Sequence, residues 1–332
     1  MIGMEQDLKL CKVLVTPTTF GLYDKRLRHE LEGLVGEVIY NRQGRPLTSS
    51  ELSEMLPGCH GFIAGLDRVD ETALESADQL KVIARYGVGV DNIDLDTAAR
   101  KKITVTNTPH ANSVSVAELT VALLLSLARS IPEAADSVRS GGWPRLQGKL
   151  LQGKTVGLIG FGCVGREVAR RLQGWGVTLL ACDPVGDEDV ALSLKVQLVE
   201  LEQLVRRADF VSLHVPILDE TRKMVNGRFL ARMRAGAYLI NTARGEIVDE
   251  LALLEALNTG HLGGAALDVY ANEPPAPDSP LRRHPRLIAT PHCASHTDGA
   301  ADGMGWQSLR DCVAVLRGEN PIHPVLLRGT AV

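Results

Sequence analysis

Three ionisable residues in the second half of the chain, Arg244, Glu273 and His292, each follow an apolar run typical of a buried strand. Ligands of open α/β sheets lie at the carboxyl ends of the strands, so we expect these side chains to meet there. Arg244 can orient a carboxylate, His292 can exchange a proton, and Glu273 can fix the imidazole tautomer. Hydride transfer to a 2-oxo acid needs such a set, because negative charge grows on the keto oxygen. Each residue also has an ordinary alternative role: Arg244 as a partner in a surface ion pair, Glu273 as a solvated loop residue, and His292 as the cap of a turn.

A glycine-rich turn with the pattern Gly-x-Gly-x-x-Gly follows the apolar run that begins at Thr155. Gly160 permits a tight turn, Gly162 lets the backbone approach a pyrophosphate, and Gly165 lets the next helix pack closely on the strand. The N-terminus of that helix, predicted over residues 166–175, offers free N–H groups to phosphates. Glycines also occur in ordinary turns, but strand, turn and helix in this order predict dinucleotide binding.

Asp183 ends the next predicted strand, residues 177–182, about 20 residues after the glycine turn. A carboxylate at this position can accept hydrogen bonds from the ribose hydroxyls of NAD, but it would repel the 2′-phosphate of NADP. Residues 184–187 contain no Arg or Lys that could neutralise such a phosphate. The sequence therefore favours NAD over NADP as the cofactor.

The composition is that of an ordinary globular protein long enough for two domains, with 332 residues, 45% hydrophobic and 23% charged, and a net charge of −4. This mild charge favours neither nucleic acid nor a membrane as a partner. The six cysteines include no Cys-x-x-Cys pair and no metal-ligand spacing, so we expect reduced thiols, no metal and a cytoplasmic location. Residues 1–12 lack an apolar signal core, and the apolar segment 119–128 is too short to cross a bilayer.

Short apolar runs alternate with helical stretches in two series along the chain. In the first series the predicted strands cover residues 13–15, 35–40, 61–64, 81–84 and 103–106. In the second they begin at residue 155 and continue at 177–182, 210–214, 237–241, 265–269 and 287–290. This alternation is typical of parallel sheets covered by helices on both faces. We therefore predict an α/β protein with two Rossmann- or flavodoxin-like domains, each a doubly wound parallel sheet.

Two long helices indicate how the series are joined. A helix predicted over residues 113–130 leads to a loop-like stretch at 141–143 before the second series, and a helix over 300–316 is expected to return to the first. The second domain is then an insertion. We assign residues 107–295 to an NAD-binding domain, and residues 1–106 with 296–332 to a substrate-binding cap domain. We expect the substrate to lie in a cleft between them, with two chain crossings as hinges.

With these motifs in order along nearly the whole chain, the sequence resembles the D-isomer-specific 2-hydroxyacid dehydrogenases, most closely the phosphoglycerate dehydrogenase-like branch. The segments that carry the resemblance are residues 84–94, 107–109, 112–118, the glycine turn, 241–249, 264–275 and 291–292. The resemblance implies NAD-dependent interconversion of a D-2-hydroxy acid and its 2-oxo acid, with Arg244, Glu273 and His292 as catalytic residues. It also implies a homodimer to which the helix over 113–130 contributes.

Substrate-binding residues also follow from the resemblance. Backbone N–H groups of Val88 and Gly89 match the family's substrate loop, where they receive the carboxylate. Asn112 matches a residue that lines the substrate cleft. Arg244 and His292 would face the substrate as well.

Cofactor-binding residues are carried over in the same way. They are Gly160, Gly162, Cys163, Val164, Gly165, Asp183, Val215, Pro216, Thr242, Ala243, Arg244, Asp268, His292 and Ser295. The amides of Cys163 and Val164 would meet the pyrophosphate, and Asp268 would lie near the nicotinamide carboxamide. The apolar members could instead be plain core residues.

Ala64 stands where the phosphoglycerate enzymes of this resemblance place a phosphate-binding arginine. Arg68, Arg85 or a basic residue of a partner subunit could substitute for it. The candidate substrates are therefore 3-phosphoglycerate, hydroxypyruvate and glyoxylate. Since the sequence ends at Val332, we expect no C-terminal regulatory domain.

Two other classes of function remain open. One is an NAD(H)-sensing binding protein similar to corepressors of this fold, and the other is a dehydrogenase of phosphite, a phosphonate or formate. The complete set of Arg244, Glu273 and His292 favours catalysis over sensing. The Val88–Gly89 loop suits a 2-oxo acid better than phosphite or formate.

Overall fold

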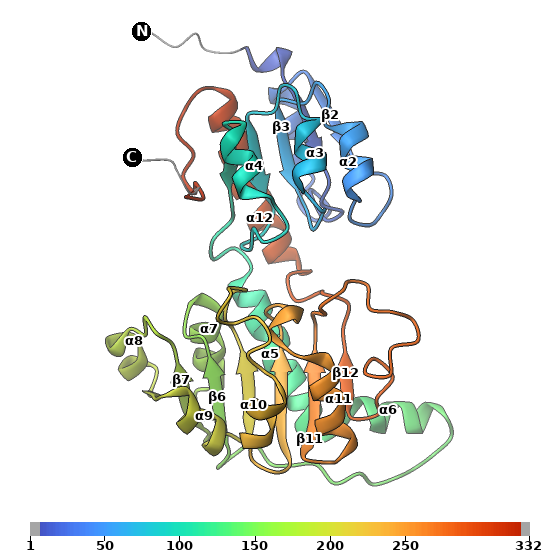
Figure 1. The fold of residues 1–332 in the computed structure, drawn as a ribbon, viewed down its shortest axis with the longest axis vertical. Coiled ribbons are helices and arrows are strands. Elements are labelled where there is room, and N and C mark those ends of the chain that lie inside the picture. The colour runs from blue at the N-terminus through green and yellow to red at the C-terminus, as the bar shows by residue number, and fades with distance from the viewer. Residues whose placement is uncertain (1–6, 327–332) are drawn as a thin grey trace. The chain divides into compact units, whose positions relative to one another are not determined.

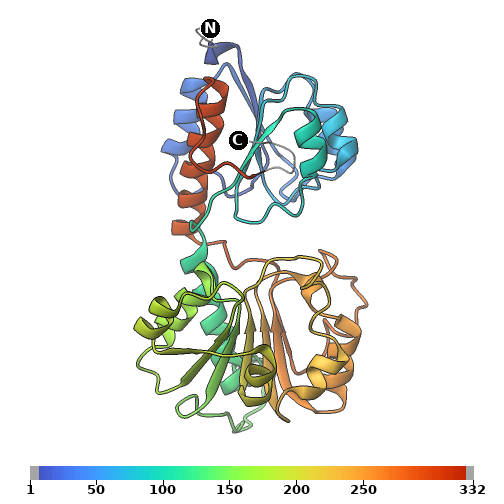
Figure 2. The same cartoon turned by 60° about the vertical axis from the view of Figure 1, so that its left-hand side comes forward.

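The structure is a computed structural model that describes residues 7–326, and it divides the chain into two compact units (Figures 1 and 2). Unit 1 contains the described residues up to Asn112 together with those from His296 onward. Unit 2 contains Ser113–Ser295. Residues 107–112 group with unit 1, although the second domain was predicted to begin at residue 107. The assignment of the two units to substrate and cofactor stays a prediction.

Unit 1 is built on a five-stranded parallel sheet with the strand order β2-β1-β3-β4-β5, which is the flavodoxin-like order. The strands are β1 (Lys12–Val15), β2 (Glu37–Tyr40), β3 (Gly61–Ala64), β4 (Val82–Arg85) and β5 (Thr104–Thr106). The helices are α1 (Arg26–Leu34), α2 (Ser49–Met55), α3 (Glu71–Glu75), α4 (Leu95–Arg100) and α12 (Asp298–Leu316). All five strands lie at or near their predicted positions.

Both faces of this sheet are buried, because successive side chains of a strand point to opposite sides. Val13 and Val15 of β1 pack with α1 and α12, whereas Leu14 packs with α2, α3 and α4. Figure 2 shows α12 beside α1 on one face of the sheet. Burial on both faces explains why these strands are almost continuously apolar.

Unit 2 is built on a seven-stranded parallel sheet with the order β12-β11-β10-β9-β6-β7-β8, which contains the doubly wound Rossmann order. The strands are β6 (Thr155–Ile159), β7 (Thr178–Cys182), β8 (Val196–Leu198), β9 (Phe210–Leu213), β10 (Ala237–Asn241), β11 (Leu262–Leu267) and β12 (Leu287–Ala289). The helices are α5 (Ser113–Arg129), α6 (Ile131–Arg139), α7 (Cys163–Leu172), α8 (Glu188–Ser193), α9 (Leu201–Arg207), α10 (Gly227–Arg232) and α11 (Glu250–Asn258). The predicted α/β class with two doubly wound parallel sheets is confirmed.

Helices cover both faces of the second sheet as well. Buried side chains of α5, α7 and α8 pack on one face, and those of α9, α10 and α11 pack on the other. The direction of winding reverses between β6 and β9, so the carboxyl ends of these strands form the switch point at which Rossmann sheets bind dinucleotides. The glycine turn follows β6, and residues 214–216 follow β9, so both segments lie at this point.

Four elements of unit 2 differ from the prediction. The helix expected over 166–175 begins at Cys163, because the last residues of the glycine turn are already helical, and it ends before Gly174, which has a φ of +82°. The strand expected at 265–269 covers Leu262–Leu267 and includes two glycines. The edge strand β8 has three residues, and α6 buries none of its side chains, so neither leaves a clear apolar pattern in the sequence.

Within residues 7–326, no single helix is long and apolar enough to cross a membrane. The pair α5 and α6, bent by 65° at their junction, reaches the length and composition of a span only when the two are taken together. About half of the α5 side chains are buried in unit 2, where the helix packs on α7, β10 and β11.

Candidate active site

The structure brings His292 and Glu273 into direct contact at the carboxyl edge of the second sheet. Nδ1 of His292 lies 2.6 Å from Oε2 of Glu273, and the two side chains are 23% and 33% exposed. The other carboxylate oxygen, Oε1, accepts a hydrogen bond from the Tyr270 amide at 3.0 Å. Glu273 is therefore oriented by its own loop, and its bond to Nδ1 leaves Nε2 of His292 as the nitrogen that can exchange a proton with a ligand.

Arg244 lies in a turn at the end of β10. The buried Asn241 side chain fixes this turn, since its Nδ2 donates to the Arg244 carbonyl at 2.8 Å and its Oδ1 accepts from an amide of the turn at 3.0 Å. The next residue, Gly245, packs on the backbone of Tyr270, where a Cβ would lie 1.9 Å from the carbonyl carbon. Only glycine lets the Arg244 turn approach the loop of Glu273 this closely.

Asp268 supports the backbone around His292. Its carboxylate is fully buried and accepts hydrogen bonds from the Thr290 hydroxyl at 2.6 Å and from the amides of Cys293 and Ala294 at 3.0 and 2.9 Å. Its carbonyl accepts from the His292 amide at 2.8 Å. The geometry thus gives Asp268 a structural role, and its predicted position near a carboxamide stays a prediction.

The glycine turn has the form that a bound pyrophosphate requires. Gly160 has a φ of +95°, and a Cβ there would lie 2.5 Å from the His214 carbonyl oxygen. A Cβ on Gly165 would lie 2.3 Å from the Gly160 carbonyl oxygen, so the start of α7 packs tightly on the turn. A Cβ on Gly162 would meet nothing within 4 Å. Gly162 thus leaves open space at the exposed N-terminus of α7, which lacks a side-chain cap and suits a pyrophosphate.

Asp183 lies at the end of β7 and is tied to the glycine turn. Its Oδ2 accepts from the Phe161 amide at 2.7 Å, and its Oδ1 accepts from the Val185 amide at 2.9 Å. Each carboxylate oxygen has a further lone pair, so the group can still accept from the ribose hydroxyls of NAD. The residues present therefore fit a bound NAD.

The remaining cofactor candidates occupy varied positions in unit 2. Cys163 is exposed in the first turn of α7, and Val164 is half-buried. Pro216 is exposed. The half-buried residues also include Val215, Ala243 and Ser295, and the buried Thr242 pairs its hydroxyl with that of Thr120 at 2.9 Å. Val215 and Ala243 pack against the apolar core, which agrees with their alternative interpretation as core residues.

The substrate candidates Val88 and Gly89 lie in the loop that follows β4 in unit 1. Val88 is 41% exposed, and its carbonyl accepts from Asn107 Nδ2 at 2.8 Å. Asn112 is the half-buried last residue of unit 1 before α5. The predicted substrate residues of unit 1 therefore belong to the segments that follow β4 and β5.

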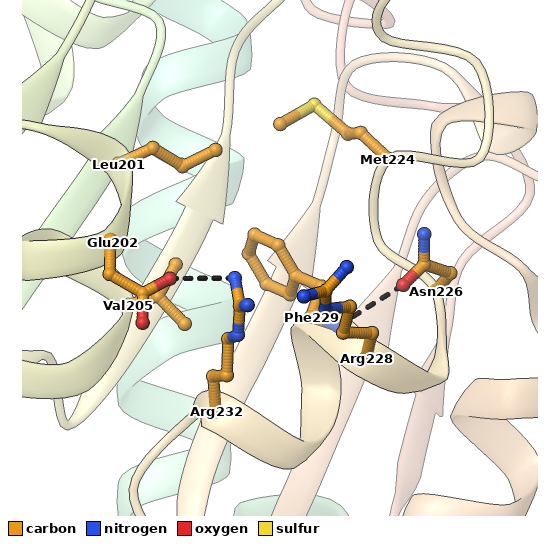
Figure 3. A pocket seen from close by; sticks show the side chains of 8 residues that line it. All are labelled: Leu201, Glu202, Val205, Met224, Asn226, Arg228, Phe229 and Arg232. Atoms are coloured by element: carbon orange, nitrogen blue, oxygen red, sulfur yellow. Dashed lines mark hydrogen bonds and ion pairs between the residues drawn. The ribbon is translucent and has the colours of Figure 1, made fainter.

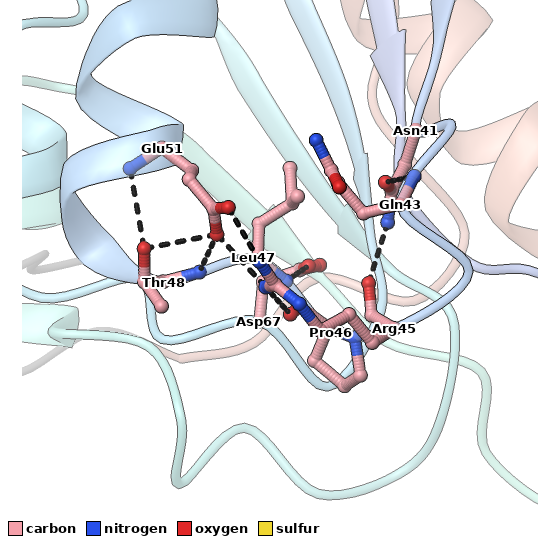
Figure 4. Close-up of polar contacts among 8 residues, drawn as sticks. All are labelled: Asn41, Gln43, Arg45, Pro46, Leu47, Thr48, Glu51 and Asp67. Atoms are coloured by element: carbon pink, nitrogen blue, oxygen red, sulfur yellow. Dashed lines mark hydrogen bonds and ion pairs between the residues drawn. The ribbon is translucent and has the colours of Figure 1, made fainter.

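Asp67 shapes the switch point of unit 1, which lies between β1 and β3. Its buried carboxylate accepts from the Leu47 amide at 2.7 Å (Figure 4) and from the Gly65 amide at 2.9 Å. Figure 4 also shows Arg45 in a forked ion pair with Glu51, at 2.6 Å for the closest atoms. Arg45, in the segment between β2 and α2, is thus already paired with a carboxylate.

A hollow of about 320 Å³ lies between α9 and α10 (Figure 3). Its floor contains Val205 and Phe229, and its rim carries Glu202 in an ion pair with Arg232 at 2.7 Å. None of the predicted site residues lines it. Within residues 7–326, no group of three or more His, Cys, Asp or Glu side chains is arranged to hold a metal ion.

The sequence did not predict the supporting roles of Asn241, Asn107 and Arg85, since it offered Arg85 only as a possible phosphate ligand. Each acts through a hydrogen bond from its side chain to a main-chain carbonyl. An asparagine or arginine at or just after the end of a strand gives no sequence signal for such a contact, because the carbonyl it reaches depends on the fold of the loop.

An imidazole paired with a carboxylate, on the same sheet edge as a dinucleotide-binding turn, is typical of nicotinamide-dependent oxidoreductases, and the fold and site define this class. Residues 121–294 match the family model of the "D-isomer specific 2-hydroxyacid dehydrogenase, NAD binding domain". The chain therefore belongs to the D-isomer specific 2-hydroxyacid dehydrogenases, and NAD is its cofactor.

Curated relatives include the D-3-phosphoglycerate dehydrogenases of Methanocaldococcus jannaschii and Homo sapiens. The first is 42% identical over 82% of this chain and 53% of the relative, and the second is 40% identical over 82% and 52%. The chain thus spans about half the length of the curated relatives it matches. These relatives place it in the phosphoglycerate dehydrogenase-like branch.

Solved structures with the same fold include two of bacterial origin. The TT0316 protein of Thermus thermophilus is 39% identical, with a TM-score of 0.85 over 95% of this chain and 100% of that one. The D-lactate dehydrogenase of Escherichia coli is 29% identical, with a TM-score of 0.81 over 95% and 100%.

Proposed function

We propose that this protein is an NAD-dependent dehydrogenase that interconverts a D-2-hydroxy acid and its 2-oxo acid. The observation that carries the proposal is the 2.6 Å contact between His292 and Glu273. The loop of Glu273 lies close to the Arg244 turn, because Gly245 packs on the backbone of Tyr270. This set supplies a proton carrier, a carboxylate that orients it and a fixed cation, and these are the groups that reduction of a ketone needs.

When bound, NADH would be the source of the hydride in the reductive direction. His292, protonated on Nε2, donates that proton to the keto oxygen as negative charge develops there. Glu273 holds the ring through Nδ1 and stabilises the charged imidazolium. Arg244 orients the substrate carboxylate and polarises the carbonyl with its planar donors. In the oxidative direction, neutral His292 accepts the hydroxyl proton.

The substrate is a small 2-oxo or 2-hydroxy acid whose carboxylate meets the amides of Val88 and Gly89. Relatives named D-3-phosphoglycerate dehydrogenase support a three-carbon acid, so 3-phosphoglycerate and hydroxypyruvate are the first candidates. A D-lactate dehydrogenase has a similar fold, and glyoxylate is a further candidate from the sequence. The substrates to be tested therefore include unphosphorylated 2-oxo acids.

The test is a spectrophotometric screen of purified protein with NADH and a panel of 2-oxo acids. We expect loss of NADH absorbance with at least one member and with D-stereochemistry in the product. His292→Asn protein, which should still bind NADH, serves as the control. Folded protein that binds NADH but reduces no member of the panel would instead support an NAD(H)-sensing role.

The protein also carries features expected of a homodimer, which we propose as its assembly. Helix α6 buries none of its side chains, and Ile131, Val138, Trp143 and Leu150 are each at least 50% exposed. Apolar side chains gathered in one segment are typical of an interface between subunits. We place the enzyme in the cytoplasm, where its six free cysteines would stay reduced.

A further inference from the structure

In the loop after β4, every carbonyl group of four consecutive residues accepts a hydrogen bond. The four consecutive carbonyls of residues 86–89 each accept a hydrogen bond from within unit 1. The donors are Arg85 Nη1 for Tyr86, the Thr108 amide for Gly87 at 3.0 Å, Asn107 Nδ2 for Val88 at 2.8 Å, and Arg85 Nε for Gly89 at 3.0 Å. Two of the four bonds therefore come from one guanidinium group.

Fixing the carbonyls also fixes the amides. In a trans peptide the N–H points opposite to the C=O of the same unit. The amide of Val88 therefore points away from Thr108, and the amide of Gly89 points away from Asn107. Within residues 7–326, neither of these two amides donates a hydrogen bond to another group. They form a pair of free donors of the kind that receives an anion.

The Arg85 guanidinium is buried and packs closely against the loop. Arg85 is only 5% exposed and also lies 3.4 Å from the Ala64 carbonyl oxygen through Nη1. Gly87 is buried with a φ of +149°, and a Cβ there would lie 2.8 Å from Arg85 Nη1. A side chain at residue 87 would thus meet both strained backbone and the guanidinium.

We propose that Arg85 is a positioning residue of the substrate loop. It binds the carbonyls at the two ends of residues 86–89, while Thr108 and Asn107 bind the two carbonyls between them, and the four bonds together hold the Val88 and Gly89 amides toward the substrate carboxylate. The sequence allows Arg85 to be a ligand of a substrate phosphate. On this proposal it has the positioning role instead. This inference rests on the proposed function.

The test compares two substrates that differ only by a phosphate, hydroxypyruvate and 3-phosphohydroxypyruvate. Arg85→Gln should raise KM for both by the same factor, about 10- to 100-fold, because hydrogen bonds to a charged group are lost. The Kd of NADH should stay within about twofold, since the cofactor residues lie in unit 2. Arg100→Gln, an exposed arginine of α4, is the matched control and should leave both KM values unchanged.

Arg85→Lys extends the test if the glutamine variant folds poorly. Lysine keeps the charge but cannot bind both carbonyls through one planar fork, so its KM should also rise for both substrates. A loss confined to the phosphorylated substrate would make Arg85 a phosphate ligand and overturn the proposal, as would unchanged KM values. Wild-type protein that reduces neither of these compounds nor any other member of the 2-oxo acid panel would overturn the proposed function instead.

Discussion

The His292 imidazole is held by its backbone as well as by Glu273. His292 has a φ of +51°, in the left-handed region that residues other than glycine rarely adopt, and its amide is bound to the Asp268 carbonyl. Such a conformation costs about 1–2 kcal/mol and persists where the surroundings hold it. The buried Asp268 carboxylate supplies that restraint through the amides of the two residues that follow.

Replacing the imidazole should remove the proton transfer without disturbing the loop. We expect His292→Asn to lower kcat by about 10²–10⁴-fold, because asparagine tolerates a positive φ but cannot carry the proton. The Kd of NADH, measured by fluorescence titration, should change by no more than about twofold. His29→Asn, on the exposed side of α1, is the control. Near-normal turnover of the His292 variant would show that another group is the acid.

Cofactor preference should depend on the Asp183 carboxylate. Asp183→Ser removes the charge that would repel a 2′-phosphate, and it weakens the hydrogen bonds expected for the NAD ribose. We expect the ratio of kcat/KM for NAD⁺ to that for NADP⁺ to fall by about 10-fold or more, roughly 1.4 kcal/mol. Asp187→Ser, nearby in the N-cap of α8, is the control. A wild type that uses both cofactors equally would contradict the assignment.

At the level of elements, the N-terminus of α7 combines a structural glycine with an open one. Gly160 is required by its positive φ and by the closeness of the His214 carbonyl. Gly162 has a φ of −77° and no atom near its missing Cβ, so the fold alone does not require glycine there. The space at Gly162 is explained if a ligand fills it.

The two glycines therefore predict opposite phenotypes. Gly162→Ala should change the free energy of unfolding without cofactor by no more than about 1 kcal/mol, yet weaken NADH binding by about 10-fold or more. Gly160→Ala should destabilise the cofactor-free protein by about 1–3 kcal/mol, because the strained φ and the clash arise in the fold itself. Chemical denaturation and NADH titration of both variants check this. Equal NADH affinity in Gly162→Ala and wild type would contradict the pyrophosphate site.

The loop that follows β9 carries a histidine that should make stability depend on pH. Burial lowers the pKa of His214 to about 4, and within the described residues its Nε2 has no hydrogen-bond partner. The folded pKa lies below the unfolded value, so the unfolded chain binds the proton first as the pH falls from about 6.5 toward 4. The free energy of unfolding should drop over that window, by roughly 3 kcal/mol at most.

Denaturant titrations of wild type and His214→Phe at about pH 7 and about pH 4.5 isolate this contribution. The wild type should lose more stability than the variant between the two conditions, because phenylalanine has no proton to bind. Carboxylates affect both proteins alike and cancel in the difference. The same loss in both proteins would show that His214 does not set this dependence.

At the level of the whole molecule, each unit buries its own apolar core on both faces of its sheet. In the segment from α6 to Leu150, several apolar side chains lie outside the core of unit 2. Trp143 is 80% exposed, which is expensive for a side chain of this size in water. An interface with a second copy of the chain would bury it.

Removing this apolar surface should weaken the dimer. We expect Trp143→Ser combined with Val138→Ser to shift sedimenting mass from dimer to monomer across a concentration series, while the far-UV spectrum stays unchanged. Leu192→Ser, which changes an equally exposed leucine of α8, should leave the mass unaffected. A wild type that is monomeric throughout the series would contradict the proposed assembly.

Most strands, the glycine turn, the cofactor class and the three residues proposed for catalysis can be predicted from the sequence, whereas the edge strand β8 cannot. These features are local, because a strand is recorded in its own apolar run and a strand-end residue is placed by the strand before it. Only the folded structure shows which groups support them, namely Asn241 at the Arg244 turn and Arg85 at the substrate loop. Their partners are main-chain carbonyls, which every residue carries, so only the folded path of the chain determines which carbonyl a side chain reaches.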